Sequence, residues 1–433
     1  MNEILLTASK LRFLLSEQSE RFKKMNLGHP REALARIEPY LKTPHVVVIT
    51  GLRRSGKSTL QAQLAHRHFP NDYHYLNFDD ERWTGFEASE FNLVHETLIE
   101  LFGEKKYFLM DEIQNIPRWE LFVRRLHDAG YKLIITGSNA SLLSREIGSH
   151  LTGRHHSVEL FPFSFKEYLG FQGVEAQAKT TAQSAHLKRA LRLYLKSGGI
   201  PDALKYPDDN FCAQLYQDII YRDISARYSM DSLKSLKEMS LFLASNIGRP
   251  VSFNKIRQML MLGSVNTVKT YLEYLEASWL YFTINVHSPS VKQQQIAAKK
   301  VYGIDTGIIH EVAFRSSEDT GWFLENAAFL HLRRQTSEIF YAKNQDDSEV
   351  DFLIRKGTKP IQLIQVAASL HDPSTRKREI ESLLKAMAHY KIKKGTILTL
   401  EEEEVLHRDG FVIHIVPATQ WLLTTNQSSA GMY

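Results

Sequence analysis

The sequence predicts an α/β fold class with a parallel sheet, because short apolar segments alternate with segments of helical pattern. The chain has 433 residues, which corresponds to about three domains rather than to one compact core. Its 43% hydrophobic and 24% charged residues exclude collagen-like, coiled-coil and largely disordered chains. The expected strands of the first domain are residues 45–50, 73–78, 107–111, 132–137 and 156–160.

The other elements follow in order along the chain. Residues 1–40 have the pattern of helices of mixed charge, interrupted near Gly28. Residues 170–186 are small and polar and are expected to form a loop, after which the helical pattern continues to about residue 247. From residue 301 onward, strands and helices alternate again.

Several function classes are excluded by composition. No apolar run approaches the about 18 residues that a membrane span needs, and the first residues lack the cleavage site of a secretory signal. The only cysteine is Cys212, so we expect no intrachain disulfide and no cysteine-based zinc site. These features predict a cytoplasmic protein without a membrane partner.

The positive charge is concentrated in one segment. The net charge of the whole chain is +5, whereas residues 232–300 alone hold nine lysine and arginine residues against three glutamates. That local excess of +6 indicates a polyanionic partner for this segment.

Residues 51–58 match the pattern G-x-x-x-x-G-K-[ST] at every fixed position, between an expected strand and an expected helix. The glycines let backbone N–H groups surround phosphate oxygens at a helix N-terminus. Lys57 is expected to contact the β- and γ-phosphates, and the Ser58 hydroxyl to bind Mg²⁺. The sequence therefore predicts a site for ATP and Mg²⁺, made by Gly51, Arg54, Ser55, Gly56, Lys57, Ser58 and Thr59.

Two acids end the expected strand 107–111 and complete this site. Asp111 would hold Mg²⁺ through water, and Glu112 would orient or deprotonate the attacking water. The alternative is that the two acids simply terminate a strand. An adjacent acidic pair favours hydrolysis over storage of the nucleotide.

Further candidates follow the next strands. Asn139, or Ser138 beside it, would contact the γ-phosphate or the attacking water, although a residue here also suits a helix cap. Arg154 would reach the γ-phosphate of another subunit in a homo-oligomer as an arginine finger, or is an ordinary surface arginine. Arg145 is the second candidate for the finger.

With these residues, the chain resembles a family of archaeal and bacterial AAA-type P-loop ATPases that carry a C-terminal domain of restriction-endonuclease-like fold. The resemblance covers nearly the whole chain. Its marks include GLRRSGKSTL (51–60), DEIQNIPRWE (111–120), TGSNASLLS (136–144), LTGR (151–154), LFPFSFKEYL (160–169), GGIPDAL (198–204), YGIDTGI (302–308), WFLEN (322–326) and SEVDFLI (348–354). It implies that Pro201 in the lid packs near the nucleotide.

The resemblance and the element pattern together divide the chain into five parts. The expected parts are N-terminal helices 1–40, an AAA-type P-loop ATPase core 41–165, a helical lid 166–231, a winged helix 232–303 and a degenerate restriction-endonuclease-like α/β domain 304–433.

Residues 235–300 resemble a winged helix-turn-helix domain. Val268, Tyr271, Leu272 and Leu275 repeat at helical spacing and leave Lys269 on the outward face of the presumed reading helix. Lys292, Lys299 and Lys300, on the expected wing, would contact DNA phosphates without reading sequence. The alternative is an inert interdomain module, which the two acids Glu273 and Glu276 near the reading helix favour.

The tail departs from the resemblance at its nuclease motif. Glu325 and Asp351 fit the first two acidic positions of restriction-like nucleases. The following strand should carry Glu-x-Lys but has Gln365 and Ala367 at those places. We therefore expect a nuclease fold without nuclease chemistry.

Two functions remain open. The first is an Mg²⁺-dependent ATPase that oligomerises and acts on DNA as a motor or remodeller. The second is a nucleotide-switched signalling or scaffold ATPase that binds a protein partner.

Overall fold

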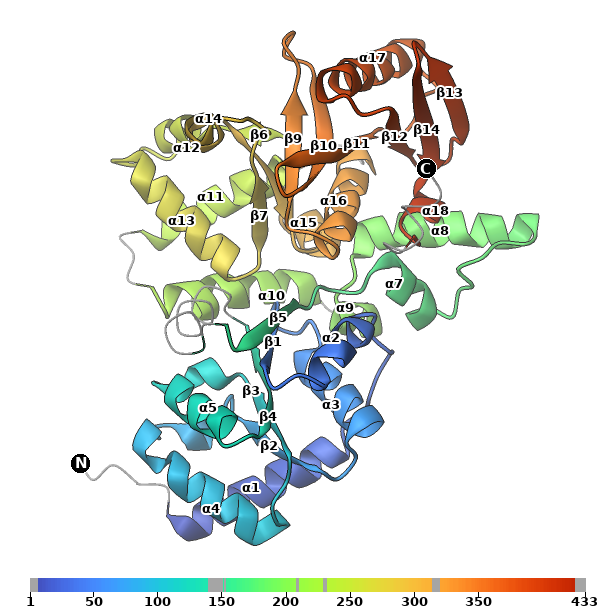
Figure 1. Ribbon diagram of the computed structural model, residues 1–433. Helices are drawn as coiled ribbons and strands as arrows, with labels where there is room; N and C mark the ends of the chain where they lie inside the picture. The colour runs from blue at the N-terminus through green and yellow to red at the C-terminus, as the bar shows by residue number, and fades with distance from the viewer. Residues whose placement is uncertain are drawn as a thin grey trace. The chain divides into compact units, whose positions relative to one another are not determined.

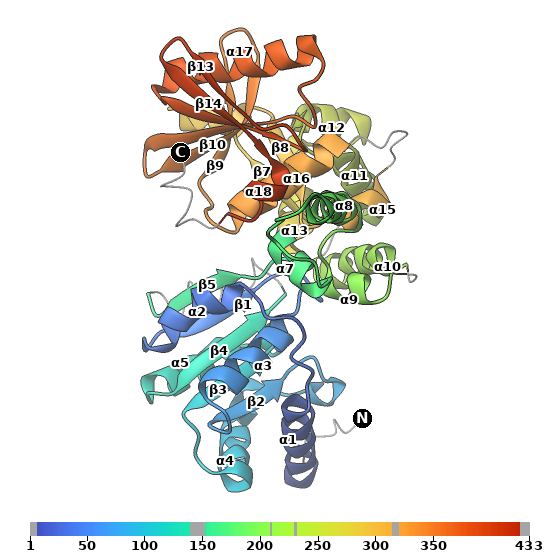
Figure 2. The same cartoon turned by 90° about the vertical axis from the view of Figure 1, so that its right-hand side faces the viewer.

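The computed structural model describes residues 7–138, 151, 153–207, 210–228, 232–313 and 320–424. The chain forms two compact units (Figures 1 and 2). The first comprises Met1–Phe161 with Ala277–Trp279, and the second comprises Pro162–Glu276 with Leu280–Tyr433. In the described parts of the chain, every helix is too short or too polar to cross a bilayer.

The first unit is built on a five-stranded sheet in the order β2-β3-β4-β1-β5, with every neighbouring pair parallel. All five expected strands are confirmed, and their carboxyl ends lie along one edge of the sheet. The strands are β1 (Val46–Thr50), β2 (Tyr73–Asn77), β3 (Tyr107–Asp111), β4 (Lys132–Gly137) and β5 (His155–Glu159).

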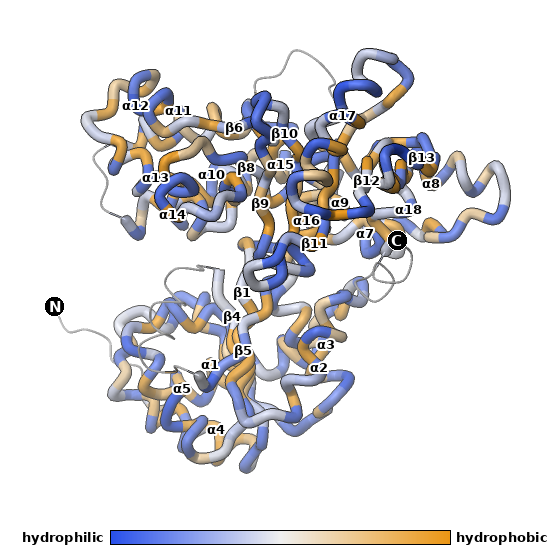
Figure 3. The backbone as a smooth tube through the Cα atoms, turned by 45° about the horizontal axis from the view of Figure 1, so that its top comes forward, coloured by the Kyte–Doolittle hydropathy of each residue, from blue (hydrophilic) through white to orange (hydrophobic). Residues whose placement is uncertain are grey.

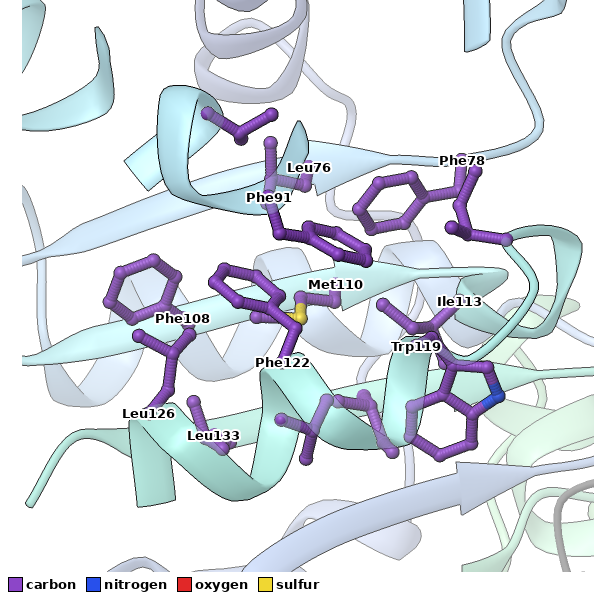
Figure 4. Close-up of a cluster of buried hydrophobic side chains, with 14 of the residues drawn as sticks. Leu76, Phe78, Phe91, Phe108, Met110, Ile113, Trp119, Phe122, Leu126 and Leu133 are labelled. Carbon is purple, nitrogen blue, oxygen red and sulfur yellow. The ribbon is translucent and has the colours of Figure 1, made fainter. Parts of the chain in front are cut away.

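Helices cover both faces of this sheet because successive strand residues point to opposite sides. Val46 and Val48 pack with α1 (Ala8–Lys23), α4 (Phe91–Phe102) and α5 (Trp119–Asp128) in one buried cluster. Figure 4 shows part of that cluster, where Phe91 and Phe122 stack beside Met110. Val47 and Ile49 pack with α2 (Ala33–Leu41) and α3 (Lys57–His68) in the other. The central strands β1 and β4 are accordingly mostly apolar, whereas β2 and β5 at the sheet edges also carry polar residues (Figure 3).

The second unit begins with helices. They are α7 (Phe165–Phe171), α8 (Thr181–Ser197), α9 (Pro201–Lys205), α10 (Phe211–Asp218), a π-helix (Ile219–Ser225), α11 (Leu233–Ser245), α12 (Phe253–Met259) and α13 (Val265–Ala277). The prediction of a loop over residues 170–186 is wrong at its C-terminal end, because Thr180 and Gln183 form a capping box that starts α8 at Thr181. On α13, Val268, Tyr271, Leu272 and Leu275 are all buried, as the helical spacing predicted.

A three-stranded antiparallel sheet, in the order β6-β8-β7, follows these helices. Its strands are β6 (Pro250–Val251), β7 (Tyr281–Ile284) and β8 (Lys299–Gly303). β7 pairs antiparallel with β8, and the residues between them include a short helix, α14 (Val291–Ile296). Ser290 caps this helix through the N–H of Gln293, so Lys292 lies on a helix rather than on a wing strand.

The remainder of the second unit contains a six-stranded mixed sheet in the order β13-β14-β12-β11-β10-β9. Helix α17 (Pro373–Tyr390) packs on β10, β11 and β12 (Figure 2). The strands are β9 (Ile339–Lys343), β10 (Glu349–Lys356), β11 (Lys359–Val366), β12 (Lys394–Thr399), β13 (Glu404–Arg408) and β14 (Phe411–Pro417). The other helices are α15 (Thr306–Val312), α16 (Thr320–Arg333) and α18 (Ala418–Trp421).

Candidate nucleotide-binding site

The loop between β1 and α3 needs both of its glycines. Gly56 precedes the first residue of α3 with φ +93°, and a Cβ there would lie 3.2 Å from Nη1 of Arg31. A Cβ on Gly51 would lie 2.2 Å from the carbonyl oxygen of Leu160, which follows β5. Side chains at these two positions would meet neighbouring protein groups, so the loop can keep this conformation only with glycine at both.

Arg31 is a buried part of this site that the sequence pattern did not reveal. Its guanidinium donates to the carbonyl oxygen of Ser55 at 2.7 Å and to that of Phe161 at 2.6 Å. The segment that carries it is held on α3, since Gln63 donates to the carbonyl oxygens of Leu27 and His29. Arg31 therefore fixes the phosphate loop against the end of the neighbouring strand.

Asp111 lies at the carboxyl end of β3 and is almost fully buried. It accepts hydrogen bonds from the hydroxyls of Ser58 and Thr136, and Tyr75 donates to it at 3.3 Å. Burial and the charge of Glu112 raise the pKa of Asp111, and the bonds from Ser58 and Thr136 oppose that shift. The predicted Mg²⁺ residues Ser58 and Asp111 are thus brought into direct contact.

Glu112 has a left-handed backbone, with φ +50°, that turns its carboxylate back toward the loop. Its Oε1 lies 3.0 Å from Nζ of Lys57, while Gln114 and the N–H of Ser138 donate to Oε2. Burial would raise the pKa of Glu112, but the charge of Lys57 and these donors lower it to about 2. Glu112 is therefore an ionised carboxylate at the end of β3.

The residues present fit Mg·ATP. Ser55 and Ser138 each hold a buried hydroxyl that has no hydrogen-bond partner among the described residues. The loop offers backbone N–H groups and an ammonium to phosphates, and Ser58 with Asp111 offers the oxygen ligands that Mg²⁺ prefers. Thr59 lies in the first turn of α3 beside Gly28, where an added Cβ would lie 3.7 Å from Cγ2 of Thr59.

Arg154 lies at the other end of the sheet from the phosphate loop. It precedes β5, whose first residue, His155, pairs with Val46 at the start of β1. The loop follows Thr50, which is four residues, or about 13 Å, further along. In its own subunit Arg154 pairs with Asp128 at 2.8 Å. An arginine finger at this position would thus have to serve a neighbouring subunit, and that role stays a prediction.

The remaining predicted residues are placed as follows. Asn139 and Arg145 lie outside the described residues. Pro201 is the first residue of α9 in the second unit, and its role near the nucleotide stays a prediction. Thr136, which sequence reasoning missed, lies on β4 and accepts the N–H of Glu112 at 3.0 Å besides its contact with Asp111.

Of the four lysines predicted to contact DNA, Lys269 and Lys292 are exposed and Lys299 is half-buried. Lys300 is only 2% exposed, and its ammonium lies 3.2 Å from Glu325 and 2.7 Å from Asp351. The prediction that Lys300 contacts DNA phosphate is therefore wrong, because its ammonium is buried and paired with the carboxylates of Glu325 and Asp351.

Comparisons with known proteins match three family models along the chain. Residues 43–169 match an AAA domain, residues 188–319 a domain of unknown function (DUF8612), and residues 320–421 another (DUF4143). The chain is 34% identical to uncharacterized protein MJ1544 of Methanocaldococcus jannaschii over 409 residues, which is 90% of each chain. It is 29% identical to an uncharacterized protein of Haemophilus influenzae over 407 residues, covering 90% of this chain and 97% of that one.

Among solved structures, the chain is similar to the ORC1 protein of Aeropyrum pernix, which was solved in complex with DNA. The identity is 13%, and the match covers 70% of this chain and 95% of that one with a TM-score of 0.30.

Proposed function

The chain belongs to the same family as protein MJ1544 of Methanocaldococcus jannaschii, and from that premise we propose that it is an Mg²⁺-dependent ATPase that oligomerises and acts on DNA as a motor or remodeller. One observation carries the ATPase part. Lys57, Ser58, Asp111 and Glu112 converge at the carboxyl ends of β1 and β3, inside the segment that matches an AAA domain.

Each of these residues has a separate task. The N–H groups of residues 51–58 hold the phosphates, and Ser58 and Asp111 hold the metal. Mg²⁺ held by Ser58 and Asp111 would supply positive charge that offsets the charge of the phosphates. Lys57 turns from Glu112 to the phosphates, which leaves the Glu112 carboxylate available to take a proton from water.

The ATPase proposal is tested by Lys57→Ala. This variant should lose binding of a fluorescent ATP analogue and lose turnover, because the ammonium is the main counter-charge for the phosphates. Lys24→Ala is the matched control, since Lys24 is an exposed lysine of the same unit. Wild-type nucleotide affinity in Lys57→Ala would contradict the proposal.

The DNA part of the proposal is supported by Lys269, Lys292 and Lys299, which remain at or near the surface of the proposed winged helix. Neutralising all three should weaken binding of duplex DNA similarly for different sequences. It should also reduce the slope of log affinity against log salt by up to about 0.9 for each lost phosphate contact. Unchanged DNA binding would remove these lysines from the interface.

The alternative function, a nucleotide-switched ATPase that binds a protein partner, is favoured by a different observation. Met261, at the turn between α12 and α13, is 93% exposed, and Met259 beside it is also exposed. Apolar side chains at such a turn suit a protein partner better than a phosphate backbone. If purified protein shows no salt-dependent DNA binding, this alternative takes precedence.

We further propose that the tail has a nuclease-like fold without nuclease chemistry. Gln365 and Ala367 replace the acid and the lysine of the expected motif. Gln365 is instead used internally, because it donates to Glu379 at 2.6 Å and accepts the N–H of Asp351. The expected test result is no cleavage of duplex or branched DNA in Mg²⁺ or Mn²⁺.

A further inference from the structure

Three charged side chains meet in the interior of the second unit. Lys300 comes from β8, Glu325 from α16 and Asp351 from β10. The Nζ atom of Lys300 lies 3.2 Å from Oε1 of Glu325 and 2.7 Å from Oδ1 of Asp351. All three residues are buried, so one ammonium group is shared by two carboxylates away from water.

The neighbouring groups complete this arrangement. Tyr302, also on β8, donates its hydroxyl to Oε1 of Glu325 at 2.8 Å. The N–H of Val366 donates to Oδ2 of Asp351 at 2.9 Å. A Cβ on Gly248 would lie 2.7 Å from Oε2 of Glu325, so glycine at this position leaves the space that the carboxylate occupies. The two acids are therefore held facing the same point.

The electrostatics favour a cation at that point, because without one at least one of the two carboxyl groups would be protonated. Two ionised carboxylates cannot be buried side by side without a compensating charge. Burial by itself would lower the pKa of Lys300, but the charges of Asp351 and Glu325 raise it well above its ordinary value. Burial and the charge of Asp351 raise the pKa of Glu325 to about 7, against the opposing charge of Lys300.

A cavity lies near the first residue of β10. A cavity of about 540 Å³ is lined by Glu349, together with Tyr341, Lys343, Pro250 and Ala298. Glu349 begins β10, two residues before Asp351, and its charge acts on Lys300 and Tyr302. None of the three charged residues lines this cavity, so the position between the two acids is filled by the lysine and closed to solvent.

We propose that the ammonium of Lys300 takes the place of a divalent cation between Glu325 and Asp351. The tail consequently binds no metal at these acids, and its folding does not depend on one. The same contact joins β8, a strand of the three-stranded sheet, to α16 and β10 of the tail. All three residues belong to the second unit, so the test below is independent of ATP hydrolysis.

The test is a titration of the full chain with Mn²⁺ in the absence of nucleotide, followed by electron paramagnetic resonance of unbound Mn²⁺. Lys300→Met removes the charge while keeping most of the side-chain volume, and it should bind one more Mn²⁺ per chain than the wild type. The added site should disappear in Lys300→Met/Asp351→Asn. A folded Lys300→Met that gains no Mn²⁺ would overturn the proposal.

Two further measurements do not depend on the folding of Lys300→Met. The melting temperature of the wild type should be the same in EDTA and in Mn²⁺, and a Mn²⁺-dependent rise that Asp351→Asn abolishes would overturn the proposal. The variant Lys300→Met/Glu325→Gln/Asp351→Asn carries no charge at the three positions and should fold with a melting temperature that Mn²⁺ does not change. Failure of this neutral variant to fold would show that charge compensation is not what the lysine provides.

Discussion

The ammonium of Lys57 lies 3.0 Å from the carboxylate of Glu112, so the residue expected to hold phosphates and the residue expected to activate water are paired with each other. The pair ties the phosphate loop to the end of β3. A phosphate that attracts Lys57 would remove one partner of Glu112 and leave the bonds from Gln114 and Ser138 to its other oxygen. For the proposed catalytic base, nucleotide binding and release of its lysine partner would therefore be one event.

Glu112→Gln should keep nucleotide binding and lose turnover by about 100-fold or more, because the amide cannot accept the proton of water. Loss of the ion pair should leave Lys57 at least as available to phosphate as before. Steady-state ATP hydrolysis and binding of a fluorescent ATP analogue measure the two effects separately. Glu104→Gln, an exposed substitution in the same unit, should change neither. Hydrolysis by Glu112→Gln at the wild-type rate would show that another group is the base.

Arg31→Ala should destabilise the first unit by about 3 kcal/mol, because it removes two buried hydrogen bonds from a charged donor. With the phosphate loop no longer held, affinity for ATP should also fall by about tenfold, or about 1.4 kcal/mol. Denaturant unfolding and nucleotide titration measure these changes. Arg12→Ala is the control, since Arg12 pairs with Glu100 at the surface and should contribute less than about 1 kcal/mol. Equal effects of the two substitutions would contradict the assigned role of Arg31.

Arg154→Ala should reduce turnover by about 10³-fold if Arg154 completes the site of a neighbouring subunit. Mixing Arg154→Ala with Lys57→Ala subunits should restore part of the activity, because each supplies the group that the other lacks. Asp128→Ala is the matched control, since it removes the partner of Arg154 within one subunit but leaves Arg154 itself in place. A strictly monomeric protein with full turnover would exclude the finger. Loss of activity in Asp128→Ala equal to that in Arg154→Ala would point to a local structural role.

His331 should make the second unit less stable in acid. Burial and the charge of Arg334 lower the pKa of His331 to about 3, whereas the unfolded chain binds that proton near the ordinary value of 6.5. The contribution of neutral His331 to the free energy of unfolding is fully present above about pH 6.5 and is lost as the pH falls toward 3. Between about pH 7.5 and about pH 5.5 the loss should be about 1.4 kcal/mol.

The matched variants for this pH effect are His331→Gln and His407→Gln. The first keeps a polar side chain beside Gln335 but cannot titrate, so its unfolding free energy should lose about 1.4 kcal/mol less over that pH interval. His407 is exposed on β13, and His407→Gln should follow the wild type. The measurement is denaturant unfolding followed by near-ultraviolet circular dichroism. An unchanged pH dependence in His331→Gln would assign the acid sensitivity to other groups.

The sequence predicted the local parts of the site and missed those that depend on tertiary contacts. The strands and the phosphate loop follow from apolar runs and a fixed spacing, and they are confirmed. The sequence did not predict the role of Arg31, because the carbonyl group of Ser55 that it binds is 24 residues away and no sequence pattern links the two residues. In the sequence Thr136 is an ordinary polar residue of a strand, and only the structure shows that its hydroxyl donates to Asp111.

Lys300 shows the limit of counting charges. Lys299 and Lys300 are adjacent in one strand, and a strand directs consecutive side chains to opposite sides. Lys299 is therefore half-buried near the ring of Phe253, at 5.9 Å from its centroid, whereas Lys300 points into the interior. Only the partners Glu325 and Asp351, which come from later parts of the chain, decide which lysine is inside.

The helices before residue 43 lie outside the segment that matches an AAA domain, but they complete the core of the first unit. Leu11, Leu14 and Leu15 of α1 belong to the same buried cluster as Val46 and Val48. A shortened chain that starts at residue 43 would expose that face of the sheet during recombinant expression and invite precipitation. The smallest fragment worth purifying for nucleotide binding therefore begins before Ala8.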